Sequence, residues 1–266
     1  MNYSIYFHGL AVIVILATLT WLLSIIKRDV SIVDSIWSLM ILAGGAVYAG
    51  GADDYGTRNA LILGLLLLWA LRLSIYLTWR NWGEPEDRRY REIRDNYSPN
   101  FALKSLGFVF LLQALLAWII SLPLWPALSL PMTVQALDVL AVALWLVGMS
   151  FETISDWQLA RFKANPANRG KVLDHGLWHY TRHPNYFGEA LIWWGFYLFA
   201  VSAGAWWTLP APLLMTWLLL KFSGVVMLEQ TISERRPAYR QYIESTNAFI
   251  PGPRKHPQHM TGGHSL

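Results

Sequence analysis

The sequence predicts an all-α integral membrane protein with seven transmembrane helices, its N-terminus outside and its C-terminus in the cytoplasm. Three observations lead to this prediction: an apolar composition, seven long apolar runs, and basic residues that gather in alternate loops. Hydrophobic residues make up 55% of the 266 residues and charged residues only 14%, which lies outside the usual range of a soluble domain. The absence of cysteine excludes disulfides, thiol nucleophiles and thiolate metal sites.

Seven apolar runs are long enough to cross about 30 Å of hydrocarbon as helices, the form in which a segment satisfies its own backbone groups. They cover residues 5–26, 31–50, 59–79, 103–122, 136–159, 187–203 and 208–228. The first run is longer than a signal-peptide core, and basic residues follow it instead of a cleavage site. We therefore expect it to be retained as a span.

The basic residues predict the orientation. Of 21 lysines and arginines, 18 fall in the first, third and fifth loops and the C-terminal segment, whereas Arg58 alone falls in a loop of the other side. Because basic loops stay in the cytoplasm, these segments are expected to be cytoplasmic. We expect one domain over residues 1–266, without nucleic-acid binding, and a disordered Pro-, Gly- and His-rich tail over 251–266.

Charged residues inside membrane spans are costly and suggest function. Here they are Asp34, Arg72, Glu152, Asp156, Glu189, Lys221 and Glu229. Together they gather toward the cytoplasmic ends of the spans, with Glu152 and Asp156 facing one way at i and i+4. For any one residue, interfacial snorkelling or an internal salt bridge such as Asp34 with Arg72 is the structural alternative. As a set, they describe a polar chamber beneath an apolar cavity, suited to a charged cofactor and a lipid-like substrate.

The densest polar stretch, GLWHYTRHPNYFGE, covers residues 176–189 directly before the sixth apolar run. Pro184 disfavours helix at His183 and is well placed to begin one, so Asn185 falls in a first turn whose free N–H groups attract an anion. Arg182 adds a planar donor for phosphate, although an interfacial arginine before a capped helix explains the same residues.

Neither a metal site nor a Rossmann-type nucleotide domain is expected. His175, His179 and His183 are spaced by four, but Gly176 and Pro184 interrupt any helix through them. The chain has no G-x-G-x-x-G, no P-loop and no alternation of strands and helices. A nucleotide must therefore be bound by helices and loops.

The chain resembles the steroid 5α-reductase family (3-oxo-5α-steroid 4-dehydrogenase, C-terminal), and in particular its bacterial members of formerly unknown function. The resemblance is carried by TRHPNYFGE at 181–189, SIVDSIW at 31–37, RLSIYLTWR at 72–80, EDRRY at 86–90, and Glu229 with FIP at 249–251. It covers nearly the whole chain. RHP-x-Y alone is less specific, because isoprenylcysteine carboxyl methyltransferases have a similar motif.

The resemblance implies a multi-pass membrane reductase of lipid metabolism, here of the bacterial cytoplasmic membrane, that uses NADPH to reduce the C=C bond of an α,β-unsaturated 3-ketosteroid or similar lipid enone. Helices within 1–122 would enclose the substrate, and 136–250 would hold NADPH. The cofactor contacts it implies are Arg72, Asp156, Lys163, Arg182, His183, Asn185, Tyr186, Glu189, Trp193 and Glu229. Ordinary span packing explains Trp193 equally well.

The resemblance also places catalysis at Asp34 and Arg72. Hydride would pass to the β-carbon of the enone while an acid polarises the ketone, a role Asp34 fills if burial keeps it protonated. Trp69 stands where the animal enzymes have a catalytic tyrosine, and an indole cannot supply a proton. Three alternatives remain for the proton donor. Asp34 acts with water, another tyrosine (Tyr48, Tyr55 or Tyr76) takes the role, or the native substrate differs from a 3-ketosteroid.

Two other functions remain open. RHP-x-Y and the C-terminal acidic residue also fit a membrane methyltransferase that uses S-adenosylmethionine, but SIVDSIW and RLSIYLTWR match the reductase pattern. The other possible function is that of a lipid-binding or scaffold protein without catalysis. The best argument for it is Trp69, which stands in place of the catalytic tyrosine.

Overall fold

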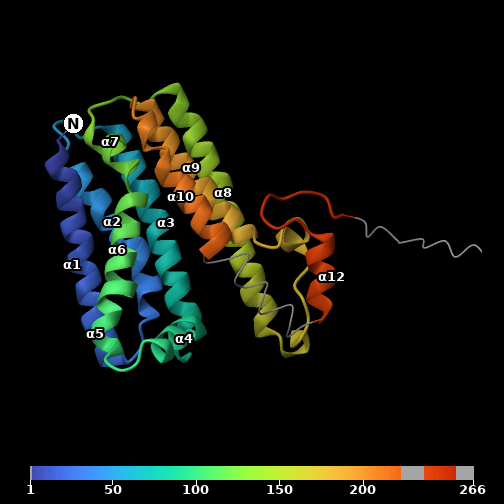
Figure 1. The fold of residues 1–266 in the computed structure, drawn as a ribbon. Helices are drawn as coiled ribbons and strands as arrows, with labels where there is room; N and C mark the ends of the chain where they lie inside the picture. Colours follow the sequence, from blue (N-terminus) through green and yellow to red (C-terminus); the bar gives the residue numbers. More distant parts are fainter. Residues whose placement is uncertain (1, 223–236, 256–266) are drawn as a thin grey trace, which may run out of the picture. The chain divides into compact units, whose positions relative to one another are not determined.

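The structure is a computed structural model, and it describes residues 2–222 and 237–255. Within these residues every regular element is a helix, as predicted (Figure 1). The chain divides into two compact units. Unit 1 comprises Met1–Ala141 with Phe196–Ala211, and unit 2 comprises Val142–Gly195 with the chain from Pro212 onward.

Unit 1 is built around α2, which packs against α1, α3, α6 and α7 (Figure 1). Its helices are α1 (Tyr3–Lys27), α2 (Ile32–Gly50), α3 (Thr57–Asn81), α4 (Arg88–Asn96), α5 (Phe101–Ser105), the π-helix η1 (Leu106–Leu111), α6 (Leu112–Ile120) and α7 (Leu124–Ser129). Small residues let α2 approach its neighbours, since a Cβ at Gly45 would overlap the Leu66 side chain of α3. The core between these helices contains the fully buried Tyr48, Trp69 and Phe110.

A buried ion pair ties together one end of unit 1. The guanidinium of Arg58, in the first turn of α3, donates to both Asp138 oxygens at 2.8 and 3.0 Å, and to the carbonyls of Ala127 and Phe199 at 2.9 and 2.7 Å. Asp138 also accepts the backbone N–H of Gln135 at 2.9 Å. Because both charged side chains are almost completely buried, this network is a structural tie.

Unit 2 contains most of α8 (Ala136–Ala164) and the first part of α9 (Pro184–Ser202). Its remaining helices are the short η2 (Pro166–Asn168) and η3 (Gly176–His179), the end of α10 (Pro210–Trp217), η5 (Leu218–Phe222) and α12 (Pro237–Ser245). The short helix η4 (Trp206–Thr208) belongs to unit 1.

Five helices among the described residues are long and apolar enough to cross a membrane. They are α1, α2, α3, the continuous helix Phe101–Ile120, and α8, and they confirm that the first five predicted apolar runs are helices, to within a turn or so at each end. The polar residues at the start of α9 keep it out of this group, and the predicted run 208–228 extends beyond the described residues. The five helices indicate an integral membrane protein.

The predicted disordered tail needs a correction at its start. Residues 251–255 are held against unit 2: the Gly252 N–H donates to the Tyr180 carbonyl at 3.1 Å, and Arg254 pairs with Asp174 at 3.1 Å. A composition rich in proline and glycine does not show these pairings, which depend on a loop seventy to eighty residues earlier. The rest of the predicted tail, 256–266, lies outside the described residues.

Candidate functional site

The polar stretch 176–189 folds as two separate helices. Residues Gly176–His179 form η3, and α9 begins at Pro184, as the sequence predicts. His175, His179 and His183 therefore do not share one helix. Among the described residues no three His, Cys, Asp or Glu side chains form a group that could hold a metal ion.

Two glycines bring α8 and α9 into contact. A Cβ at Gly188 would lie 2.5 Å from the Gly148 carbonyl oxygen and 2.7 Å from the Glu152 nitrogen, and a Cβ at Gly148 would lie 2.6 Å from the Gly188 oxygen. Any larger side chain at either position would force the backbones apart. This crossing places the α8 face that carries Glu152 and Asp156 against the first two turns of α9.

Acidic side chains surround this crossing. Glu152, Asp156 and Glu189 are 3%, 5% and 5% exposed, so water reaches almost none of their surface. The Asn185 amide donates to Asp156 at 3.3 Å across the two helices. We refer to Glu152, Asp156, Asn185 and Glu189 as the crossing site.

Trp193 fixes one member of the crossing site. It lies one turn after Glu189, is fully buried, and donates from its indole nitrogen to the Glu189 carboxylate at 3.0 Å. This bond holds the carboxylate in one orientation. The predicted packing of Trp193 on a nicotinamide ring stays a prediction.

The loop before α9 is fastened to α8. The Gln158 side chain accepts the Leu177 N–H at 3.1 Å, and the Trp178 indole donates to the Ser155 carbonyl at 3.1 Å. Gly176 has a φ of +64°, a conformation that favours glycine, and a Cβ there would overlap Gln158. The start of α9 is thereby positioned relative to the crossing site.

Arg182 has a structural role that the sequence did not indicate. Its Nη1 donates to the Ile243 carbonyl at 2.9 Å and to that of Thr246, at the C-terminal end of α12. Carbonyls at a helix end lack partners within the helix, so Arg182 caps α12. Its predicted contact with a cofactor phosphate stays a prediction.

Tyr242 of α12 fastens the same loop by donating to the Trp178 carbonyl at 2.5 Å. Burial raises the pKa of Tyr242, so the hydroxyl keeps its proton and remains a donor.

The other predicted cofactor residues come from different parts of the chain. The rings of His183 and Tyr186 stack in parallel with centroids 5.4 Å apart, and His183 is buried. Lys163 is exposed near the end of α8. Glu229 lies outside the described residues, and Arg72 belongs to unit 1.

In unit 1 the structure joins Asp34 to the EDRRY motif. One Asp34 oxygen accepts from the Arg89 guanidinium at 3.0 Å, and the other from the Tyr90 hydroxyl at 2.6 Å. Both oxygens are thus acceptors, whereas the predicted role in catalysis needs a proton on Asp34. Arg89, and not Arg72, forms the ion pair seen at Asp34.

The same motif organises its own loop. Asp87 caps the start of α4 by accepting the Arg89 N–H at 2.9 Å and binds the Arg89 side chain at 3.1 Å. Burial raises the pKa of Asp87, but the charge and hydrogen bonds of Arg89 outweigh it, and the net pKa is lowered. Glu86 accepts from Arg94 at 2.8 and 2.9 Å and from the Val30 N–H at 2.8 Å. Burial raises the pKa of Tyr90 well above its ordinary value, so it stays a donor to Asp34.

Arg72 and the candidate tyrosines lie in different surroundings. The Arg72 guanidinium lies over the Tyr76 ring, 5.3 Å from its centroid. Trp69 is fully buried and packs edge-on against Trp37 at 6.5 Å. Tyr48 is buried and shares a hydrogen bond with Ser121 at 3.0 Å, whereas Tyr55 is 51% exposed. Tyr90, which sequence reasoning did not single out, is the tyrosine that contacts Asp34.

Residues 20–246 match the family described as "Protein of unknown function (DUF1295)". The chain belongs to this DUF1295 family. An uncharacterized protein of the fission yeast Schizosaccharomyces pombe is 25% identical over 279 residues, which cover 91% of this chain and 78% of that protein. No solved structure matches the chain significantly. Since this relative comes from a yeast, the bacterial membrane stays a prediction.

In this DUF1295 protein, sequence reasoning missed the two glycines of the crossing. Gly148 lies one turn before Glu152, and Gly188 lies directly before Glu189. A glycine in each of two apolar helices, next to an acidic residue, was the signal that could have paired them. Its meaning depends on which two helices meet, and one helix alone does not show that.

Proposed function

We propose that this protein is a membrane reductase that uses NADPH to reduce the C=C bond of an α,β-unsaturated 3-ketosteroid or a similar lipid enone. The observation that carries the proposal is the crossing site, where buried acidic groups of α8 and α9 meet the half-buried amide of Asn185. The motifs shared with the steroid 5α-reductases support it, since TRHPNYFGE supplies two of the four residues. The five apolar helices provide the membrane setting that such a substrate requires.

The chemistry of the crossing site suits a dinucleotide. Buried carboxylates accept hydrogen bonds, and ribose hydroxyls are donors that they can bind. Asp156, Glu189 and Asn185 would hold the ribose and amide groups, while Lys163 and Arg182 would supply the positive charge that the phosphates need. His183, Tyr186, Trp193, Arg72 and Glu229 complete the proposed cofactor contacts.

We further propose seven spans, with the N-terminus outside and the C-terminus in the cytoplasm. The sixth span would be α9, which has 19 residues, and the seventh would be the predicted run 208–228, which includes α10 and η5. The support is the placement of 18 of the 21 basic residues in segments that would then all be cytoplasmic.

NADPH, when bound, supplies the hydride, so the chain must orient the groups and stabilise charge. In the proposal Asp34 and Arg72 act at the substrate ketone. Arg89 and Tyr90 are positioning residues that hold the Asp34 carboxylate from two sides.

A second candidate is a methyltransferase that uses S-adenosylmethionine. The acidic character of the crossing site favours it, because this cofactor carries a ribose, an amino group and a positive sulfonium that carboxylates also bind. The reductase is preferred because the N-terminal motifs match that family and not the methyltransferases.

One experiment distinguishes the candidates. Full-length protein purified in detergent is incubated with NADPH and a panel of enone steroids, and in parallel with S-adenosylmethionine and isoprenyl thioether acids. Steroid-dependent NADPH oxidation supports the reductase, and Asp34→Asn is expected to abolish it while NADPH still binds. Methyl transfer without any NADPH oxidation would overturn the proposal in favour of the second candidate.

A further inference from the structure

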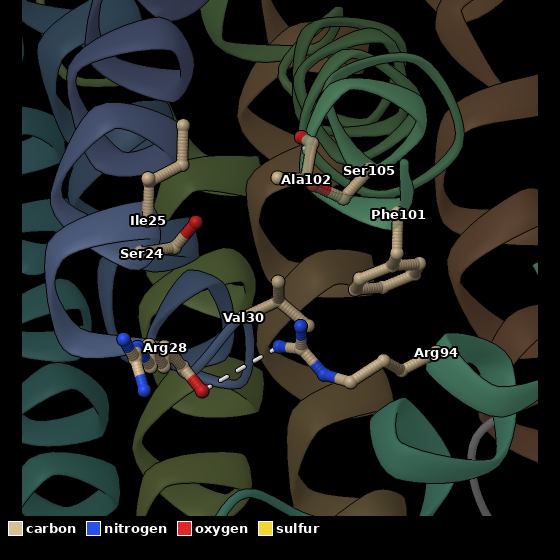
Figure 2. A pocket seen from close by; sticks show the side chains of 8 residues that line it. All are labelled: Ser24, Ile25, Arg28, Val30, Arg94, Phe101, Ala102 and Ser105. Atoms are coloured by element: carbon tan, nitrogen blue, oxygen red, sulfur yellow. Dashed lines mark hydrogen bonds between the residues drawn. The ribbon is translucent and has the colours of Figure 1, made fainter. Parts of the chain in front are cut away.

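An open pocket lies in unit 1 at the end of α1 (Figure 2). Its volume is about 490 Å³. Ser24 and Ile25 of α1 form one side, Phe101 and Ala102 of α5 form the opposite side, and Arg94 of α4 lies between them. No motif used for the proposed cofactor or catalytic sites lines this pocket.

The only side-chain N–H donors that line the pocket are cationic. The hydroxyl of Ser24 donates to the Trp21 carbonyl at 2.7 Å, and that of Ser105 donates to the Ala102 carbonyl at 2.8 Å, so neither proton is available. Arg94 and Arg28 are the remaining polar side chains of the lining. A ligand that accepts hydrogen bonds is therefore met by two guanidinium groups.

Arg94 is held with one nitrogen toward the pocket. Its Nε and Nη2 bind Glu86 at 2.9 and 2.8 Å, and Nη2 also lies 3.5 Å from the Arg28 carbonyl. Figure 2 shows the other terminal nitrogen, Nη1, pointing up between α1 and α5. The Cζ atom of Arg94 lies 4.6 Å from the centroid of the Phe101 ring, and this contact fixes the plane of the guanidinium.

Arg28 adds a second positive charge at the mouth. It ends α1 with a φ of 54°, its side chain is exposed, and within the described residues its guanidinium donates no hydrogen bond. Glu86, Asp29 and Asp95 offset the charge of Arg94, so Arg28 is the guanidinium of the lining that no described carboxylate pairs. The pocket therefore favours an anion.

The walls beside the pocket face lipid. Ile25 and Ile26 of α1 are 42% and 80% exposed, and Leu103 and Phe108 on the opposite side are 69% and 43% exposed. Both helices are long and apolar enough to span a membrane, so we expect these side chains to face acyl chains. The end of a span lies at the level of the lipid headgroups, where phosphate is the common anion.

We propose that this pocket binds the phosphate of an anionic glycerophospholipid, with Arg28 and Arg94 on the phosphate and an acyl chain along Ile25 and Phe101. The ligand combines the two features that the lining shows, an anionic head and an apolar tail. A free phosphate ion would use only the first.

Native mass spectrometry of the full-length protein, titrated with phosphatidylglycerol in detergent, tests the proposal. Arg28→Asn removes the charge while asparagine tolerates the left-handed backbone, and we expect phosphatidylglycerol affinity to fall about five-fold. Ala102→Phe, at an exposed position of the wall, fills the pocket and is expected to lower affinity at least as much. Lys27→Asn removes the same charge from the neighbouring residue, which does not line the pocket, and should change affinity less than about two-fold.

Three results would overturn the proposal. Equal losses in Lys27→Asn and Arg28→Asn would show diffuse surface charge, and equal binding of phosphatidylcholine by all variants would show that no anion is recognised. Displacement of the lipid by inorganic phosphate at equal concentration would identify a free-phosphate site. Each variant is first shown to melt like the wild-type protein, and Arg28→Asn with its control decides the outcome if Ala102→Phe does not fold.

Discussion

Each unit buries charged side chains, but it does so in a different chemical form. In unit 1, Arg58 and Asp138 match one cation to one anion, and further bonds to carbonyls occupy the guanidinium. In unit 2, three acidic residues gather at a helix crossing, where the amide of Asn185 and the indole of Trp193 are among the donors. A balanced pair joins helices, whereas a group rich in acceptors is suited to a ligand rich in hydroxyl donors.

Breaking the unit 1 pair is expected to have the largest effect. Arg58→Met leaves Asp138 buried without its cation, and the free energy of unfolding should fall by about 3–5 kcal/mol. Unfolding of the purified protein in increasing concentrations of a denaturing detergent measures this free energy. The double variant Arg58→Met with Asp138→Leu should recover most of the loss, because no charge is then stranded. A single variant as stable as the wild type would show that the pair is not a tie.

The next effect is expected at the crossing itself. Gly188→Ala places a Cβ against the backbone of α8, and overpacking of this kind costs about 1–3 kcal/mol. The matched control is Gly64→Ala in α3, where a Cβ meets nothing within 4 Å and alanine favours helix. Thermal unfolding of both variants gives the comparison. If they melt alike, the close approach of α8 and α9 is wrong.

The smallest effect is expected at Asp87, outside the spans. Its lowered pKa means that its contribution to stability is complete above the ordinary carboxyl pKa and is lost as the pH falls through the folded pKa. Because the Asp87–Arg89 pair is partly exposed, the contribution is about 0.5 kcal/mol. Asp87→Asn keeps the helix cap, so its melting temperature should depend less on pH between 5 and about 3 than that of the wild type. If the wild type and Asp87→Asn show the same dependence of melting temperature on pH, the ion pair does not contribute to stability.

Local sequence patterns predicted the features of the fold that depend on residues close together in the sequence. Five spans follow from apolar runs, and the start of α9 follows from Pro184. The i, i+4 spacing placed Glu152 and Asp156 on one face of α8, and the structure turns that face toward α9. These features need no knowledge of distant segments.

Pairings between distant segments were missed for the opposite reason. Arg58 was assigned only to a loop, because its partner Asp138 lies 80 residues later. Asp34 was paired with Arg72 as an alternative, although the EDRRY loop brings Arg89 and Tyr90 to it. The capping of α12 by Arg182 was also missed, because the carbonyls that it binds at the end of α12 carry no signature in the sequence.

The central claim is that the crossing site holds NADPH, and titration calorimetry on the full-length protein tests it most directly. The account predicts that the wild type binds NADPH, and that Asn185→Ala and Glu189→Gln each weaken binding about ten-fold or more, the effect of losing a hydrogen bond to a charged group. Glu92→Gln, in an exposed pair of α4, should bind like the wild type. Wild-type affinity in both crossing-site variants would contradict the claim.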